Sequence, residues 1–93
     1  MFYLEPTTRF KKDLKKIKKS KKDFEAVVNV LRLLQKNGVL AIPEKMRPHR
    51  LKGDYKDNWE CHIKPDLLII WFQMDADRII KLIRVGSHSQ LFK

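Results

Sequence analysis

An unbroken apolar run covers residues 67–72, between turn signals at residues 65–66 and 75–77. The run is far too short to cross a bilayer, and it predicts a central strand that is buried on both faces. Before it, apolar and polar residues alternate over 59–63, which is typical of a half-buried strand. After it, residues 79–85 form another strand-like run. The second half of the chain therefore predicts a meander of antiparallel strands.

The first half of the chain begins with a short strand-like segment, residues 2–4, followed by the spacing of a helix. Phe10, Leu14 and Ile17 recur at helical intervals. Thr7 and Thr8 precede them and are suitable N-cap residues. We therefore expect a first helix that begins at these threonines and continues to a turn near residue 20.

A second helix is expected after the turn, capped by Asp23 and ended by Gly38 as its C′ residue. Its apolar positions follow the i, i+3, i+4, i+7 rhythm and are Phe24, Val27, Val28, Leu31 and Leu34. The two helices then form an antiparallel hairpin. Residues 39–58 predict a loop with a short strand around Arg50 and Leu51. The whole order, an N-terminal strand, a helix hairpin and an antiparallel β-meander, predicts a single α+β domain over residues 1–93.

The charge of the chain is strongly positive, with 21 Lys and Arg against 11 Asp and Glu and a net charge of +10. This balance favours a polyphosphate, an acidic protein or an anionic membrane surface as partner. Lysines crowd residues 11–22, where Asp13 is the one acid. They form either a solvated helix face or a surface for backbone phosphates, and the lack of interleaved acids favours the second interpretation slightly. The chain has no leader-like or membrane-spanning pattern, and we expect a cytoplasmic protein that does not contact membrane.

Titratable residues gather at the strand ends. His62 alternates onto the polar side of its strand, and Asp66 follows the next turn, so the two side chains can come close together. A carboxylate beside an imidazole orients it and favours its charged form, which suits acid–base chemistry. Arg84 ends an apolar strand on the side of Ile80 and Leu82, where it either clamps a phosphate or extends to solvent.

The single cysteine, Cys61, cannot form an intramolecular disulfide, which is compatible with a reducing cytosol. Cys61 and His62 are adjacent in a strand and point to opposite faces, and no second pair of such residues exists. This is a poor metal-ligand pattern, and we expect neither a metal nor another cofactor. The Cys61 side chain is expected to face the core, which argues against a nucleophilic role.

Three segments, residues 49–53, 60–68 and 84–92, together resemble the YafQ branch of the RelE/ParE superfamily of toxins from type II toxin–antitoxin pairs. The resemblance covers essentially the whole chain and implies a RelE/ParE-like, microbial RNase-like fold. It also implies a ribosome-dependent mRNA endonuclease that is neutralised by a cognate antitoxin. The family's active-site positions fall on His49, His62, Asp66, Arg84, His88 and Phe92. One departure is Leu67, where members of this branch commonly carry tryptophan.

Such an enzyme would cut RNA with the substrate's own 2′-OH. In the hypothesis that follows, His88 is the general acid and Arg84 the cation that stabilises the phosphorane. The base is Asp66 or His62, and His49 is a second base or a phosphate contact. Phe92 would position a base of the RNA. The remaining expected substrate contacts are Lys11, Lys12, Lys15, Lys52 and Lys64.

The resemblance also predicts partners. The lysine faces are expected to bind ribosomal RNA in the A site of the 70S ribosome, where mRNA is cut. An acidic antitoxin segment is expected to fold over the toxin, and operator DNA would be bound only through the antitoxin complex. Two alternatives stay open: a ParE-like inhibitor of DNA gyrase with the same fold, and a basic nucleic-acid-binding module without catalysis.

Overall fold

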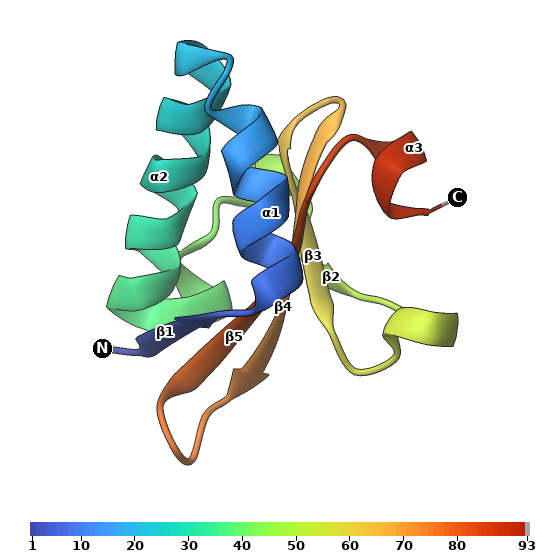
Figure 1. Ribbon diagram of the computed structural model, residues 1–93. Coiled ribbons are helices and arrows are strands. Elements are labelled where there is room, and N and C mark those ends of the chain that lie inside the picture. Colours follow the sequence, from blue (N-terminus) through green and yellow to red (C-terminus); the bar gives the residue numbers. More distant parts are fainter. Residues whose placement is uncertain (93) are drawn as a thin grey trace.

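The computed structural model describes residues 1–92 and contains a mixed sheet with helices on both of its faces (Figure 1). The strands are β1 (Tyr3–Pro6), β2 (His49–Arg50), β3 (Trp59–Lys64), β4 (Leu67–Met74) and β5 (Ile79–Gly86). The helices are α1 (Thr8–Ile17), α2 (Lys21–Asn37) and α3 (His88–Leu91), and single 3₁₀ turns are η1 (Gly38–Ala41), η2 (Glu44–Met46) and η3 (Gly53–Tyr55). The expected α+β class is confirmed.

The sheet has the order β1-β5-β4-β3-β2. Strands β2 to β5 pair antiparallel, as the predicted meander requires, whereas β1 lies parallel to β5 at one edge. The central position of β4 agrees with its apolar sequence, because its first five residues are all buried. The predicted short strand around residues 50–51 lies at His49–Arg50 and forms the opposite edge. Among the described residues, no helix has the length and apolar content to cross a membrane.

The helix ends show which capping predictions were right. Thr7 caps α1, because its Oγ1 accepts the N–H of Phe10 at 3.2 Å. The prediction for Asp23 was wrong: Ser20 is the N-cap of α2, and its Oγ accepts the N–H of Asp23 at 3.3 Å. Gly38 ends α2 with φ of 61°, a value that favours glycine, so this predicted stop is confirmed.

The two faces of the sheet have different coverings. Helices α1 and α2 cover one face and enclose the main core, which includes Phe10, Leu34, Cys61 and Trp71. We call the opposite side the site face. It carries a smaller apolar cluster of Leu68, Ile70 and Leu91, with Leu51, Tyr55, Ile83 and Phe92 packed against it. Helix α3, which the sequence did not predict, lies on the site face (Figure 1).

A register shift in β5 changes the expected direction of Arg84. Trp71 pairs with Leu82 but Ile70 pairs with Arg84, so one extra residue, Ile83, is accommodated between them. The prediction that Arg84 shares a strand face with Ile80 and Leu82 was therefore wrong. Arg84 is instead in register with Ile70, a member of the cluster on the site face.

Candidate active site on the open face of the sheet

Strand register aligns polar residues in a row across the site face. His49 of β2 is opposite Glu60 of β3, Glu60 is opposite Ile70 of β4, and Ile70 is opposite Arg84 of β5. Paired residues in a sheet direct their side chains to the same face. The register therefore brings together residues that lie 35 positions apart in sequence, from His49 to Arg84.

A second row lies beside the first, with His62 of β3 opposite Leu68 of β4 and Leu68 opposite Gly86 of β5. Since neighbouring strands are about 4.8 Å apart, the backbones of His62 and Gly86 are about 10 Å apart. His88 follows Gly86 by two residues at the start of α3. The two histidines therefore approach the site face from opposite sides of β4.

Glu60 contacts both His49 and His62. Its side chain is buried, and its Oε1 lies 3.2 Å from His49 Nε2 and 3.8 Å from His62 Nε2. The two imidazole rings are stacked with their centroids 6.4 Å apart. The second oxygen, Oε2, is buried without a hydrogen-bond partner among residues 1–92. A buried carboxylate of this kind orients an imidazole through a direct contact.

His49 makes a second contact through its other ring nitrogen. Nδ1 lies 2.8 Å from the carbonyl oxygen of Arg47, which can only accept, so a hydrogen bond there is donated by His49. The imidazole is therefore held between the Arg47 carbonyl and the Glu60 carboxylate.

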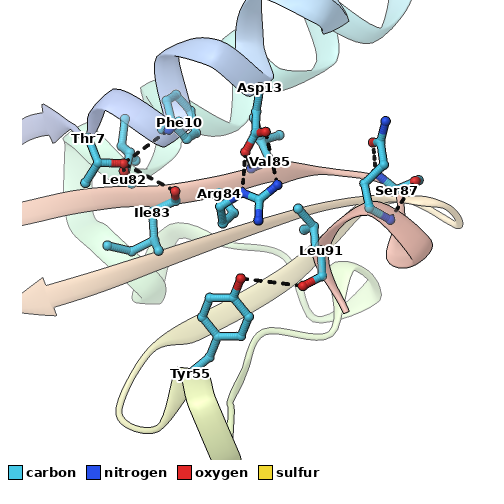
Figure 2. Close-up of polar contacts among 11 residues, drawn as sticks. Thr7, Phe10, Asp13, Tyr55, Leu82, Ile83, Arg84, Val85, Ser87 and Leu91 are labelled. Atoms are coloured by element: carbon cyan, nitrogen blue, oxygen red, sulfur yellow. Dashed lines mark hydrogen bonds and ion pairs between the residues drawn. The ribbon is translucent and has the colours of Figure 1, made fainter. Parts of the chain in front are cut away.

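Arg84 is held by a carboxylate from the other side of the sheet. Asp13 of α1 accepts from Arg84 Nε through Oδ2 at 2.6 Å and from Nη2 through Oδ1 at 3.2 Å (Figure 2). The same Oδ2 accepts the N–H of Val85 at 3.2 Å. The hydrogen bond to Asp13 is the main cause that raises the pKa of Arg84, and the nearby hydroxyl of Tyr55 adds a smaller contribution. The guanidinium is therefore a fixed, permanently charged group.

Asp66 lies beside His88 and not beside His62. Its Oδ1 accepts the backbone N–H of His88 at 3.0 Å, and no hydrogen bond or ion pair joins it to His62 in the described chain. Ser87 caps α3 and exchanges hydrogen bonds with Gln90 in a capping box. Together these contacts fix the first turn of α3, on which His88 is exposed to solvent.

Aromatic contacts connect α3 to the loop before β3. The His88 and Phe92 rings have centroids 5.0 Å apart, and Phe92 meets Tyr55 edge-on at 5.7 Å. The hydroxyl of Tyr55 lies 3.5 Å from the carbonyl oxygen of Leu91 (Figure 2). Lys52 lines a shallow pocket with Tyr55 and Phe92. Phe92 is therefore placed where a base could stack beside His88.

The remaining predicted contacts fall elsewhere. Lys11, Lys12 and Lys15 are exposed on α1. The Nζ of Lys64 is ion-paired with Asp23 Oδ1 at 2.6 Å. Leu67 is buried and packs in the main core.

Cys61 is fully buried in the main core, as its alternation in β3 predicts. Burial, with the charge of Glu60 second, raises the pKa of its thiol to about 12. A thiol in this state is not a nucleophile at neutral pH, so the core assignment of this residue is supported.

Sequence reasoning overlooked three residues of the site, Glu60, Asp13 and Tyr55. Glu60 shares the polar side of β3 with His62, and that alternation could have identified it. Asp13 is the one acid within the lysine-rich stretch of residues 11–22. That isolated position could have indicated a carboxylate with a specific partner. Nothing in the sequence marks Tyr55.

Several solved structures that share this fold are of bacterial toxins or of their complexes. The structure of YafQ from E. coli strain BL21(DE3) superposes with a TM-score of 0.87 at 27% identity, and each chain is covered completely. A metal-bound toxin from Helicobacter pylori is 37% identical with a TM-score of 0.84, covering 99% of this chain and 100% of that one. The E. coli DinJ–YafQ complex matches at 28% identity with a TM-score of 0.86, again with full coverage of both chains.

The profile of the bacterial toxin YafQ of type II toxin–antitoxin systems matches residues 2–93, and the chain belongs to this family. A relative from E. coli strain K12, the mRNA interferase toxin YafQ, is 29% identical over 89 residues, which are 96% of this chain and 94% of the relative.

Proposed function

We propose that this toxin is an mRNA endoribonuclease that cuts by acid–base attack of the substrate's 2′-OH. The observation that carries the proposal is the register of β2 to β5, which puts His49, Glu60 and Arg84 in one row, beside a second row that runs from His62 to Gly86, two residues before His88. The similar protein from E. coli strain K12 is named an mRNA interferase. RNA supplies its own nucleophile, so these side chains provide what the reaction requires of a protein.

The base and acid act from the two sides of β4. His62 takes the proton of the 2′-OH as its oxygen attacks phosphorus, and His88 gives a proton to the departing 5′ oxygen. The products are a 2′,3′-cyclic phosphate and a 5′-hydroxyl. His62 is favoured over Asp66 as the base because an oxygen of Asp66 accepts the N–H of His88. Asp66 is then the residue that positions the acid.

Arg84 stabilises the charge that develops on the phosphorane. Asp13 engages Nε and one terminal nitrogen, which leaves Nη1 available for the phosphate oxygens. His49, held by its contacts with Arg47 and Glu60, adds a second contact for the phosphate in the same row. Oriented charges of this kind typically contribute about 10²–10³-fold to the rate.

The substrate is mRNA in the A site of the 70S ribosome in the cytoplasm. Phe92 stacks on a base, and Lys11, Lys12, Lys15 and Lys52 contact RNA backbone. Lys64 has less support than these four lysines, since its ammonium group is paired with Asp23. A cognate antitoxin neutralises the protein, in line with the DinJ–YafQ complex of E. coli. Operator DNA is bound only through that antitoxin.

Controlled expression in a bacterial host tests the proposal, with wild type compared with His88→Ala and His62→Ala and with mRNA 5′ ends mapped. We expect growth arrest and new in-frame cuts with wild type, and a loss of about 10²–10⁴-fold in cleavage for each variant. In vitro, the products should carry 2′,3′-cyclic or 3′-phosphate ends. A 3′-hydroxyl end, or unchanged cleavage by a folded His88→Ala protein, would contradict the mechanism. Arrest without mRNA cuts would indicate another target.

A further inference from the structure

A cleft of about 500 Å³ lies where α1 and the α1–α2 turn face the end of β5. This volume is within the range of ligand pockets, about 300–1,000 Å³. Besides Arg84, three basic residues line it: Arg9, Lys16 and Lys19. On α1, positions 9, 13 and 16 lie on one helix face, so Arg9 and Lys16 flank Asp13. None of the proposed RNA contacts Lys11, Lys12, Lys15, Lys52 and Lys64 belongs to this lining.

The carboxylates in the cleft have partners, whereas these three cations have none. Asp13 is paired with Arg84, and Asp23 is paired with Lys64. Asp66 accepts the N–H of His88. Arg9, Lys16 and Lys19 are exposed and make no ion pair with any residue of the described range 1–92. The positive charge of the cleft is therefore available to an anion from solution.

The cleft is continuous with the candidate active site. Asp66 and Arg84 belong to both, and Ser87, which caps α3, lines the cleft one residue before His88. Ile17, which is half-buried, provides apolar surface in its wall. A chain of phosphates that passes Arg84 would thus meet cations in the cleft and apolar surface for a sugar or base.

We propose that this cleft binds the RNA backbone next to the cut phosphate, with Arg9, Lys16 and Lys19 as phosphate contacts. The inference rests on the proposed ribonuclease function and adds a binding subsite to it. The backbone comes from the mRNA strand that is cut or from ribosomal RNA. In either case the contacts do not read sequence and act on affinity.

The test compares two variants that lose the same charge. One is the Arg9→Gln, Lys16→Gln, Lys19→Gln protein, and the control is Arg32→Gln, Lys36→Gln, Lys81→Gln, whose residues are exposed and lie outside the cleft. Cleavage of ribosome-bound mRNA is measured in single turnover over a range of toxin and salt concentrations. Thermal unfolding of both proteins excludes a general loss of fold.

For the cleft variant we expect weaker half-saturation with the maximal rate kept within about twofold, because no altered group touches the reacting atoms. The slope of log affinity against log salt should become shallower by about 2, since each single-strand phosphate contact contributes about 0.7. The control variant should show a markedly smaller loss of affinity and a smaller change in the salt slope. Equal losses in both variants would overturn the inference and leave the ribonuclease function intact, whereas no cleavage by wild type would overturn the function itself.

A second measurement separates the two sources of backbone. Binding to free single-stranded RNA and to empty ribosomes is compared in a His88→Ala background. If the cleft variant binds free RNA more weakly, the cleft contacts the mRNA strand. If only its binding to ribosomes is weaker, the cleft contacts ribosomal RNA. Unchanged binding to both, with loss of antitoxin binding only, would assign the cleft to a protein partner and overturn the inference.

Discussion

Asp13 determines where the Arg84 guanidinium lies. Both side chains are nearly buried, with 10% and 11% of their surface exposed. Removing one partner of such a pair leaves an uncompensated charge, which costs about 3–5 kcal/mol when burial is complete. We expect Asp13→Asn to lower the free energy of unfolding by about 3 kcal/mol and to reduce kcat more than it changes KM.

The measurement is urea unfolding of Asp13→Asn, Arg84→Gln and the double variant. The double variant should regain part of the loss, because neither remaining side chain is then charged. Simple addition of the two single losses would contradict the pairing seen in the structure. Asp13→Glu should restore kcat in part, which a purely structural role would not require.

Glu60 is argued to act through the histidines and is therefore a positioning residue. Glu60→Gln keeps the size of the side chain but removes the carboxylate that faces both His49 and His62. We expect kcat to fall by about 10²-fold. The readout is the split between kcat and KM, with Glu60→Asp as the conservative variant: kcat should fall in Glu60→Gln with KM nearly unchanged, and Glu60→Asp should restore part of kcat. An unchanged kcat in a folded Glu60→Gln protein would remove the argument that Glu60 positions the histidines.

Helix α3 is a short element whose position depends on its cap. Ser87→Ala removes the acceptor for the N–H of Gln90, and the loss of an N-cap costs about 1 kcal/mol. Because α3 carries His88, we expect cleavage to fall roughly fivefold, which is the factor that about 1 kcal/mol represents. Ser89→Ala on the same helix is the matched control. Equal activity of the two variants would show that α3 needs no cap to place His88.

The elements also show which features local sequence rules can supply. Ser20 and Asp23 are both good N-cap residues, and the choice between them follows from tertiary structure, because Asp23 reaches Lys64 on β3. Arg84 was placed on the wrong strand face because a register shift leaves no signal in the apolar pattern. The long helices and the antiparallel meander of β3, β4 and β5, in contrast, follow from sequence patterns that extend over many residues.

On the scale of the whole molecule, the site depends on contacts between the two ends of the chain. Thr7 Oγ1 donates to the carbonyl oxygen of Leu82 at 2.8 Å, across 75 positions of sequence, and this contact fixes the start of α1 on β5. Asp13 on α1 is thereby brought to Arg84. The histidines could be identified from motif resemblance, but their shared contact with Glu60 required the register of the folded sheet.

The buried thiol of Cys61 makes the free energy of unfolding depend on pH in the alkaline range. Burial and the charge of Glu60 raise the pKa of its thiol from 9.0 to about 12. As the pH rises, the thiol loses its proton in the unfolded chain before it does so in the folded protein. The contribution of the buried thiol to the free energy of unfolding is therefore complete below pH 9 and is lost between pH 9 and 12. The loss is at most about 1.4 kcal/mol per pH unit. Urea unfolding between pH 8 and 10 should therefore show a steeper decline for wild type than for Cys61→Ala, which shares every other titrating group; parallel declines would contradict the raised pKa.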